Sequence, residues 1–142
     1  MNIKLININY KDENLLKQIH IWRNDKDTRQ YFTNSNEISF ELFLDVIIPE
    51  YKKSGIDPFI IVSEDINIGI ISFVTKNNKL YIGINIEKSF RNKNIGKSVL
   101  KDVLVILKKK DLWCEPIYAK IKKDNIASIK LFSKYFYLDS ED

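Results

Sequence analysis

The spacing of hydrophobic residues changes several times along the chain, and each change predicts a different element. Residues 2–8 alternate apolar and polar side chains, which is typical of a β-strand with mixed burial. In residues 13–24 the apolar side chains instead recur at helical spacing, behind Asp12, which can cap a helix. We expect a second short helix over residues 28–32 and an amphipathic helix over about residues 40–53.

Residues 58–86 have the pattern of β-structure. Three runs rich in β-branched and aromatic residues are separated by turns at Glu64-Asp65 and Asn77-Asn78. The runs cover residues 58–63, 66–75 and 79–86. We therefore expect an antiparallel meander of three strands.

The last third of the chain alternates helices and strands. A long amphipathic helix is expected over residues 95–110, where its C-terminal lysines suit the helix dipole. A strand over residues 116–121, a helix over 125–134 and a short strand over 135–138 complete the pattern. A helix between two strands normally brings the second strand in parallel with the first, so we expect two such crossovers beside the meander. The predicted class is α+β, or mixed α/β, with a central mixed sheet flanked by helices.

Composition supports one folded unit without a structural metal. The chain has 142 residues, 44% of them hydrophobic and 30% charged, which fits a single domain over residues 1–142. Cys114 is the only cysteine and His20 the only histidine, so neither an intrachain disulfide nor a cysteine or histidine metal site is expected. The sequence contains no signal-peptide pattern and no membrane-spanning run, so we expect a cytoplasmic protein that has no membrane partner.

The net charge of +4 favours anionic ligands only weakly. Lysines cluster at residues 108–110 and 120–123, but aromatic side chains do not interleave with them as a base-stacking groove requires. Nucleic-acid binding is therefore the least favoured function.

A strand, a short polar loop and the start of a long helix follow one another between Tyr81 and Ser98. Such a junction directs free backbone N–H groups and the positive end of the helix dipole to one place, which suits a phosphate or pyrophosphate. Lys93 and Lys97 add positive charge there, and Gly96 opens the helix. An ordinary loop with an ordinary helix start is the alternative interpretation.

Two motifs in this half of the chain resemble those of the GNAT superfamily of N-acetyltransferases. The run Ile86-x-x-x-x-Arg91-x-x-Asn94-x-Gly96 is similar to the acyl-CoA signature of that family, a strand followed by Q/R-x-x-G-x-G/A and a helix. The segment from Asn125 to Phe132 resembles the family's N-x-A-S-x-x-L-Y/F segment. The order of elements is also that of the family over nearly the whole chain. The resemblance implies an enzyme that transfers an acetyl group directly from acetyl-CoA to an amine, without a metal.

The resemblance also implies where acetyl-CoA binds. Its pyrophosphate would lie on the N–H groups of about residues 92–97, and its pantetheine between the strands ending at Ile86 and Ile121. A backbone N–H near Ile86 would face the thioester carbonyl, where a fixed donor stabilises the negative charge that develops during attack. The implied cofactor-binding residues are Ile84, Ile86, Arg91, Asn92, Lys93, Asn94, Ile95, Gly96, Lys97, Asn125 and Ser128.

Three positions depart from the family's pattern. Asn94 stands where the signature has its first Gly, and Asn tolerates a positive φ better than most residues. Phe132 stands where the family often has a Tyr thought to protonate the departing thiolate, and Phe136 where it has a Gly. Little of the chain remains for the family's last strand, so we expect that strand to be short or missing. An open edge could pair with a second subunit, which makes a homodimer one expectation.

Hydroxyl and carboxyl groups near the expected thioester are the candidates for proton transfer. On a helix from Asn125, positions 128, 132 and 135 share one side, so we predict that Tyr135 is the acid that protonates the thiolate. Glu87, at the exit of a strand, could take the proton of the acceptor ammonium. The alternatives are a packed aromatic at Tyr135 and a solvated carboxylate at Glu87, and His20 is assigned no role.

The first helical region suggests the acceptor. The pattern Trp22-Arg23-Asn24, then Arg29, then Ile38-Ser39 is similar to that of GNAT enzymes that acetylate nucleotide-linked amino sugars. The chain's arginines are Arg23, Arg29 and Arg91, and guanidinium groups suit phosphates. The predicted substrate-binding residues are Trp22, Arg23, Asn24 and Arg29. Ion pairs between these arginines and nearby carboxylates are the alternative, and a protein or peptide amine, or a non-catalytic acyl-CoA-binding module, are the other functions left open.

Overall fold

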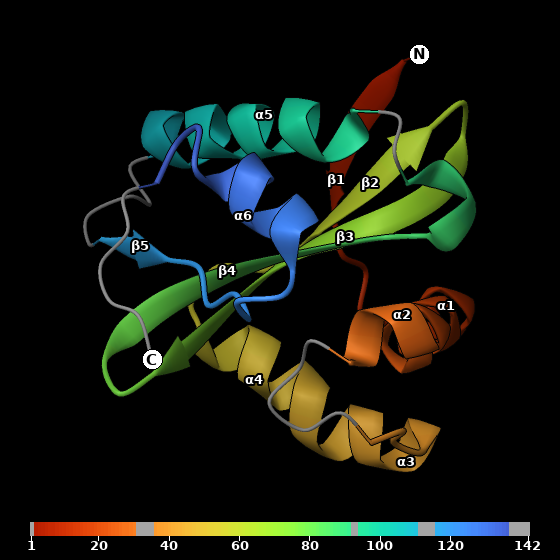
Figure 1. Ribbon diagram of the computed structural model, residues 1–142. Coiled ribbons are helices and arrows are strands. Elements are labelled where there is room, and N and C mark those ends of the chain that lie inside the picture. The colour runs from red at the N-terminus through yellow and green to blue at the C-terminus, as the bar shows by residue number, and fades with distance from the viewer. Residues whose placement is uncertain (1, 31–35, 92–93, 111–115, 137–142) are drawn as a thin grey trace.

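In the described part of the chain, one five-stranded sheet crosses the middle of the molecule with helices on both faces (Figure 1). The computed structural model describes residues 2–30, 36–91, 94–110 and 116–136. The strands follow in both chain order and sheet order: β1 (Ile3–Asn7), β2 (Phe59–Ser63), β3 (Ile66–Lys76), β4 (Lys79–Ile86) and β5 (Ile117–Tyr118). The first four are antiparallel neighbours and β5 is parallel to β4. The mixed sheet confirms the predicted class of fold.

Helices cover the two faces of the sheet separately (Figure 1). One face carries α1 (Glu13–Asn24), α2 (Lys26–Arg29), α3 (Phe40–Leu42) and α4 (Ile48–Lys53). The other carries α5 (Ile95–Lys109) and α6 (Ile126–Phe132). Each predicted helix is present, although some bounds differ by a few residues. The strand predicted over residues 116–121 is reduced to β5, and the final strand predicted over 135–138 lies largely outside the described residues.

A π-helical turn, Phe43–Ile47, joins α3 to α4 where the sequence predicted one uniform helix. The N–H of Ile48 bonds to the carbonyl of Phe43, five positions earlier. Pro49 accounts for this turn, because proline has no N–H to donate and its ring crowds the carbonyl four positions before it.

The direction of neighbouring strands differs between the two helical connections. β4 and β5, joined through α5, are parallel, with Leu80 opposite Ile117. β1 and β2 are also joined through helices, yet they are antiparallel, with Ile3 opposite Ser63. The parallel crossover predicted through residues 95–110 is therefore confirmed. Several helices lie between β1 and β2, and so long a path can return to either end of the sheet.

The two predicted hairpin turns are confirmed. Glu64 and Asp65 have φ values of 50° and 64°, and Asn77 and Asn78 have values of 52° and 61°. Positive φ at both central residues is the backbone of a type I′ turn, whose twist matches that of the flanking strands. Each turn fixes the pairing of the residues beside it, and the register of β2 on β3 shifts between Ile61 and Val62.

The sheet separates two hydrophobic cores. The side chains packed between the sheet and α5 include Ile61, Ile71, Phe73, Val99 and Val103. Those packed between the sheet and α1–α4 include Ile19, Trp22, Phe43, Ile60 and Ile70. The apolar faces of the longer helices α1 and α5 hold them on the sheet, so the ends of these two helices are placed precisely relative to the strands.

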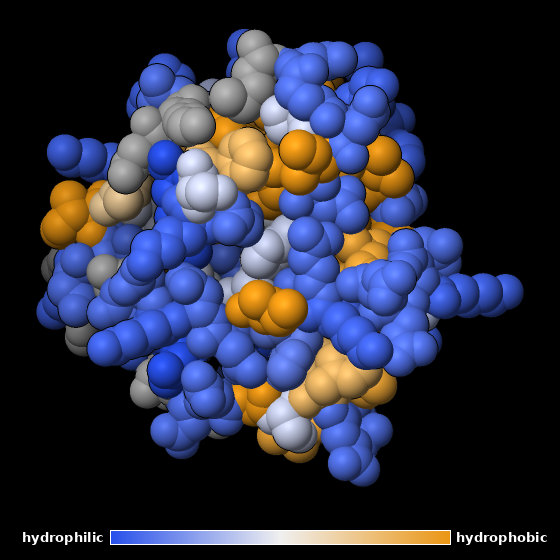
Figure 2. Space-filling view, turned by 90° about the vertical axis from the view of Figure 1, so that its right-hand side faces the viewer, coloured by the Kyte–Doolittle hydropathy of each residue, from blue (hydrophilic) through white to orange (hydrophobic). Residues whose placement is uncertain are grey.

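The surface on the right-hand side of Figure 1 is mainly hydrophilic, with smaller hydrophobic areas between the hydrophilic ones (Figure 2). No helix within the described ranges combines the length and the apolar character that crossing a membrane requires.

Candidate functional site

The C-terminal part of β4 continues beyond its neighbour β5. The two strands pair at Leu80–Ile117 and Tyr81–Tyr118, whereas β4 runs on to Ile86. On its other side β4 pairs with β3 along its whole length, as far as Gly69 opposite Ile86. The stretch from Gly83 to Ile86 therefore has strand β3 on one side and no β5 pairing on the other. This is where the sequence places the pantetheine and the thioester.

The start of α5 directs backbone donors toward the same end of β4. Asn94 has a φ of 58°, so the predicted left-handed conformation at the position of the signature's first Gly is confirmed. The first hydrogen bond into the helix joins Ser98 N to Asn94 O at 3.4 Å. The N–H groups of residues 95–97 precede it and lack a partner within the helix. With the dipole of a 15-residue helix, they suit an anion.

Gly96 brings three elements together. A Cβ at this position would lie 3.3 Å from Leu131 Cδ2 of α6 and 3.6 Å from Ile86 Cδ1 of β4. The first turn of α5 thus packs against the end of β4 and against α6, and Ile95 beside it is buried. The cofactor-binding residues predicted on β4 and on α5 are brought together by this contact.

Asn125 and Ser128 lie at the N-terminus of α6. The Asn125 side chain caps the helix, because its Oδ1 accepts a hydrogen bond from Ser128 N at 3.3 Å. Asn92 and Lys93, the remaining members of the predicted set beside Arg91, lie outside the described residues.

Lys97, in the first turn of α5, lies close to Lys134, which follows α6. Contact with the Lys97 side chain, then desolvation and charge repulsion, lower the pKa of Lys134. Two ammonium groups in contact repel one another, and an anion placed between them would relieve that repulsion. Sequence reasoning missed Lys134, because nothing in its own neighbourhood links it to Lys97.

A cavity of about 360 Å³ lies between α1 and the turn that follows β4. Its lining residues are His20, Ile21, Trp22, Asn24, Asp25, Glu87, Lys88 and Arg91. The cavity thus joins the region predicted to bind the acceptor to Glu87, the predicted base. It also includes His20, to which the sequence assigned no role, and Asp25, which the sequence suggested only as an ion-pair partner of Arg23 or Arg29.

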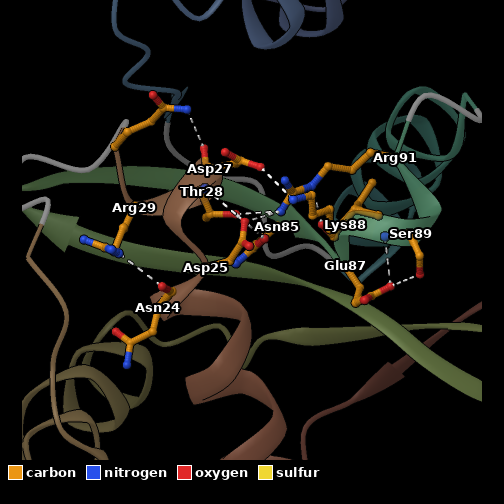
Figure 3. Close-up of polar contacts among 12 residues, drawn as sticks. Asn24, Asp25, Asp27, Thr28, Arg29, Asn85, Glu87, Lys88, Ser89 and Arg91 are labelled. Carbon is orange, nitrogen blue, oxygen red and sulfur yellow. Dashed lines mark hydrogen bonds and ion pairs between the residues drawn. The ribbon is translucent and has the colours of Figure 1, made fainter.

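Arg91 reaches from the turn after β4 to the junction between α1 and α2 (Figure 3). Its Nε donates to the carbonyl oxygen of Ile86 at 2.8 Å. A terminal nitrogen donates to Thr28 Oγ1 at 2.6 Å and lies 3.2 Å from Asp25 Oδ2. The described contacts of this side chain therefore join the α1–α2 junction to the end of β4.

Asp25 is the anionic partner in this group. Its Oδ2 accepts from Thr28 N at 3.2 Å and from Thr28 Oγ1 at 3.1 Å, which caps α2. Burial raises the pKa of Asp25, but the hydrogen bonds from Thr28 and Arg91 and the charge of Arg91 outweigh it, and the pKa lies below its usual range. The carboxylate is therefore held in its ionised form.

The predicted substrate-binding residues make contacts within the protein. Trp22 is 5% exposed and belongs to the core beneath α1. The Asn24 amide donates to Ile38 O at 2.8 Å and accepts from Ile38 N at 3.0 Å. Arg29 donates through Nε to Asn24 O at 3.1 Å and lies 3.8 Å from Glu37. The alternative of an ion pair is thus present at Arg29.

Arg23 lies close to Tyr51, a buried tyrosine of α4. Burial lowers the pKa of Arg23, while Tyr51 and Glu50 raise it. Burial also raises the pKa of Tyr51 to about 12. The guanidinium is therefore in a partly desolvated place beside the helices that cover this face of the sheet.

His20 is held by contacts on two sides. Its Nε2 lies 2.7 Å from the carbonyl oxygen of Ile38, and its ring centroid lies 5.6 Å from those of both Phe40 and Phe43. These contacts fix the orientation of the ring where it borders the cavity.

The two predicted proton-transfer residues lie on different segments. Glu87 accepts hydrogen bonds from the backbone N–H of Ser89, at 3.2 Å, and from the Ser89 hydroxyl. Tyr135 follows α6 in a turn and is 39% exposed. Phe132, at the family's usual Tyr position, is 7% exposed and packs edge-on against Phe136 at 5.3 Å. The Phe132 side chain is part of the hydrophobic core between the sheet and α5.

Comparisons with known proteins identify the family and the fold. A family model described as an acetyltransferase (GNAT) domain matches residues 3–135. No curated protein matches the sequence significantly.

Solved structures share the fold. A ribosomal-protein alpha-N-acetyltransferase in complex with coenzyme A is 18% identical over 99% of this chain and 82% of its own, with a TM-score of 0.78. Spermidine N-acetyltransferase from Vibrio cholerae, in complex with CoA and spermine, is 15% identical over 98% of this chain and 82% of its own, with a TM-score of 0.79. A domain from Methanocaldococcus jannaschii is 25% identical over 94% of this chain and 86% of its own, with a TM-score of 0.73.

Proposed function

Because the chain belongs to the acetyltransferase (GNAT) domain family, we propose that it transfers the acetyl group of acetyl-CoA to an amine bound in the cavity between α1 and the turn after β4. The observation that carries this proposal is the contact between Ile86 and Gly96. Ile86 ends the part of β4 that extends beyond its pairing with β5, and Gly96 lies in the first turn of α5. This contact places the strand end beside the donors of the helix start.

The described residues fit the parts of acetyl-CoA. The N–H groups of residues 95–97 and the ammonium groups of Lys97 and Lys134 would hold its phosphates. Ile84 and Ile86 would lie along its pantetheine. Asn125 and Ser128 would border it from α6. When bound, acetyl-CoA supplies the activated acyl group, and the residues of the chain supply orientation and proton transfer.

The proposed chemistry is attack by a neutral amine. Its nitrogen bonds to the acetyl carbon, the carbon–sulfur bond breaks, and the amine proton passes to Glu87 directly or through water. A backbone N–H near Ile86 would stabilise the carbonyl oxygen as it becomes negative. Tyr135 would return a proton to the leaving thiolate, and its exposure leaves its hydroxyl able to reach a ligand.

The acceptor is the finer part of the proposal. By their names, the similar enzymes acetylate a ribosomal protein and spermidine, so likeness of fold leaves the acceptor open. A nucleotide-linked amino sugar is supported by the pattern of Trp22, Arg23, Asn24 and Arg29, although these side chains also fasten the helices to one another. A peptide N-terminus is the second candidate.

A panel of amines tests this proposal. Purified protein and acetyl-CoA would be incubated with a nucleotide-linked amino sugar, the free amino sugar, a peptide with a free N-terminus and spermidine, and the products analysed by mass spectrometry. We expect one amine to gain one acetyl group with release of one equivalent of coenzyme A. A strong preference for the linked over the free sugar supports the nucleotide contact. Binding of coenzyme A without acetylation of any amine would indicate a non-catalytic module instead.

A further inference from the structure

We infer that Arg91 is a positioning residue for the acceptor side of the site: its guanidinium holds the α1–α2 junction against the end of β4. The inference rests on the proposed function for its consequence, but its geometry is independent of any ligand. It gives this arginine a different task from the cofactor contact that the signature implies.

A single guanidinium connects three segments. The Ile86 carbonyl belongs to the end of β4, Thr28 to α2, and Asp25 to the junction between α1 and α2. The three contacts are 2.8, 2.6 and 3.2 Å long. The group is planar and its N–H directions are fixed, so satisfying these acceptors together sets the distance between the junction and the strand.

The α1–α2 junction needs such a contact. α2 has four residues, and none of them is buried. A helix of this length is unstable by itself and normally depends on packing of an apolar face. Hydrogen bonds must therefore determine where it lies. Besides its cap from Asp25, Thr28 Oγ1 lies 3.4 Å from Asn85 Oδ1, again at the end of β4.

The ion pair within this group is shielded from solvent. The Arg91 and Asp25 side chains are 28% and 27% exposed, whereas the neighbouring pair between Lys88 and Asp27 is 71% and 52% exposed. A shielded, hydrogen-bonded pair orients its partners more strongly than one in free contact with water.

The consequence concerns the acceptor cavity. Asp25 and Arg91 border it together with Glu87, which follows directly on β4. If the junction loosens, the wall that faces Glu87 moves while the start of α5 stays in place. Binding of the amine should suffer and binding of the cofactor should not.

Hydrogen exchange and calorimetry on the full chain test the inference. The amides of Thr28, Arg29 and Gln30 bond to carbonyls of Asp25 and Lys26 at 2.9 to 3.4 Å and report on α2. In Arg91→Ala we expect these amides to exchange roughly tenfold faster, while amides of β2 and β3 keep their rates. The Kd of this variant for coenzyme A should stay within about twofold of the Kd of the unsubstituted protein.

Three further variants sharpen the test. Arg91→Lys keeps the positive charge but loses the planar guanidinium with its several N–H donors. The α2 amides of this variant should therefore exchange at rates between those of Arg91→Ala and of the unsubstituted protein. Thr28→Val removes one acceptor of the guanidinium and should accelerate the same amides if Arg91→Ala does not fold. Lys17→Ala removes a cation from the exposed pair with Glu13 and should change nothing.

Kinetics supply a readout that a general loss of stability would not produce. For the amine that the panel identifies, Arg91→Ala should raise the acceptor KM roughly tenfold and leave the KM of acetyl-CoA within about twofold. Unchanged exchange in α2, or a loss of coenzyme A affinity of roughly tenfold or more, would overturn the inference. Failure of the proposed function would be recognised by a different result, because the unsubstituted protein would then bind no coenzyme A or acetylate no amine.

Discussion

Gly69 on β3 and Asn85 on β4 approach so closely that a Cβ at position 69 would lie 2.5 Å from the Asn85 carbonyl oxygen. It would also lie 3.1 Å from the Cα of Ile86. The backbone of β4 cannot give way cheaply, because β4 is paired with β3 along its length. The absence of a side chain at Gly69 therefore determines where the end of β4 lies, and that end carries the carbonyl bound by Arg91.

Gly69→Ala should displace the end of β4. We expect a loss of about 1 to 3 kcal/mol in the free energy of unfolding, together with a lower rate of acetyl transfer, because overpacking forces the backbone to move. Gly83→Ala is the matched control, since a Cβ there meets only the Ser72 hydroxyl at an ordinary 3.5 Å. Urea denaturation of the two variants would measure the difference. Equal midpoints would show that the contact at Gly69 is not tight.

Asn24→Ala should destabilise the protein rather than simply weaken substrate binding. The variant leaves the N–H of Ile38 without its partner, which typically costs about 1 to 3 kcal/mol, while the Ile38 carbonyl keeps its contact with His20. Asn14→Ala changes an exposed asparagine of the same helix and should have little effect. Thermal or urea denaturation distinguishes them. A stable Asn24→Ala variant with a raised acceptor KM would favour the substrate contact.

Lys97→Ala should weaken coenzyme A binding. A charge-assisted hydrogen bond to phosphate contributes about 1.5 to 3 kcal/mol, so the Kd should rise roughly tenfold or more. Lys108→Ala removes the same charge at the opposite end of α5 and should leave the Kd within about twofold. Calorimetry at moderate salt gives both values. Equal effects of the two variants would mean that only net charge matters.

Stability should depend on pH through Asp25. Its pKa is lowered in the folded protein, so the carboxylate contributes stability above its unfolded pKa of about 3.9, and this contribution is lost as the pH falls through the lower folded value. Asn can still cap a helix, so Asp25→Asn removes mainly the charge. The unsubstituted protein should be more stable than this variant at neutral pH, and this difference should shrink below about pH 4. An advantage independent of pH would rule out this role.

Local signals explain how far the sequence predicts the fold. The hairpins could be predicted because Glu64-Asp65 and Asn77-Asn78 favour positive φ whatever surrounds them. The start of α5 was also predictable, since a polar loop before an amphipathic helix is a local pattern. The antiparallel pairing of β1 with β2 was not, because it depends on how the intervening helices pack.

The residues of the candidate site also differ in how far local sequence predicts their contacts. Gly96 and Asn94 were found from motif spacing, and their geometry agrees with it. Arg91 was also found, but its partner Asp25 is 66 positions away, and no pattern of local sequence connects them. The spacing around Trp22 predicted a substrate contact, yet its burial is a property of the packed core.

The central claim is that acetyl-CoA binds where the end of β4 meets the first turn of α5. Titration of coenzyme A into the ¹⁵N-labelled protein, followed by NMR, tests this claim most directly. We expect the largest amide shifts at Ile84, Ile86, Gly96, Lys97 and Ser128, with saturation below about 1 mM. Shifts confined to α1–α4, or no shift at about 1 mM coenzyme A, would contradict the claim.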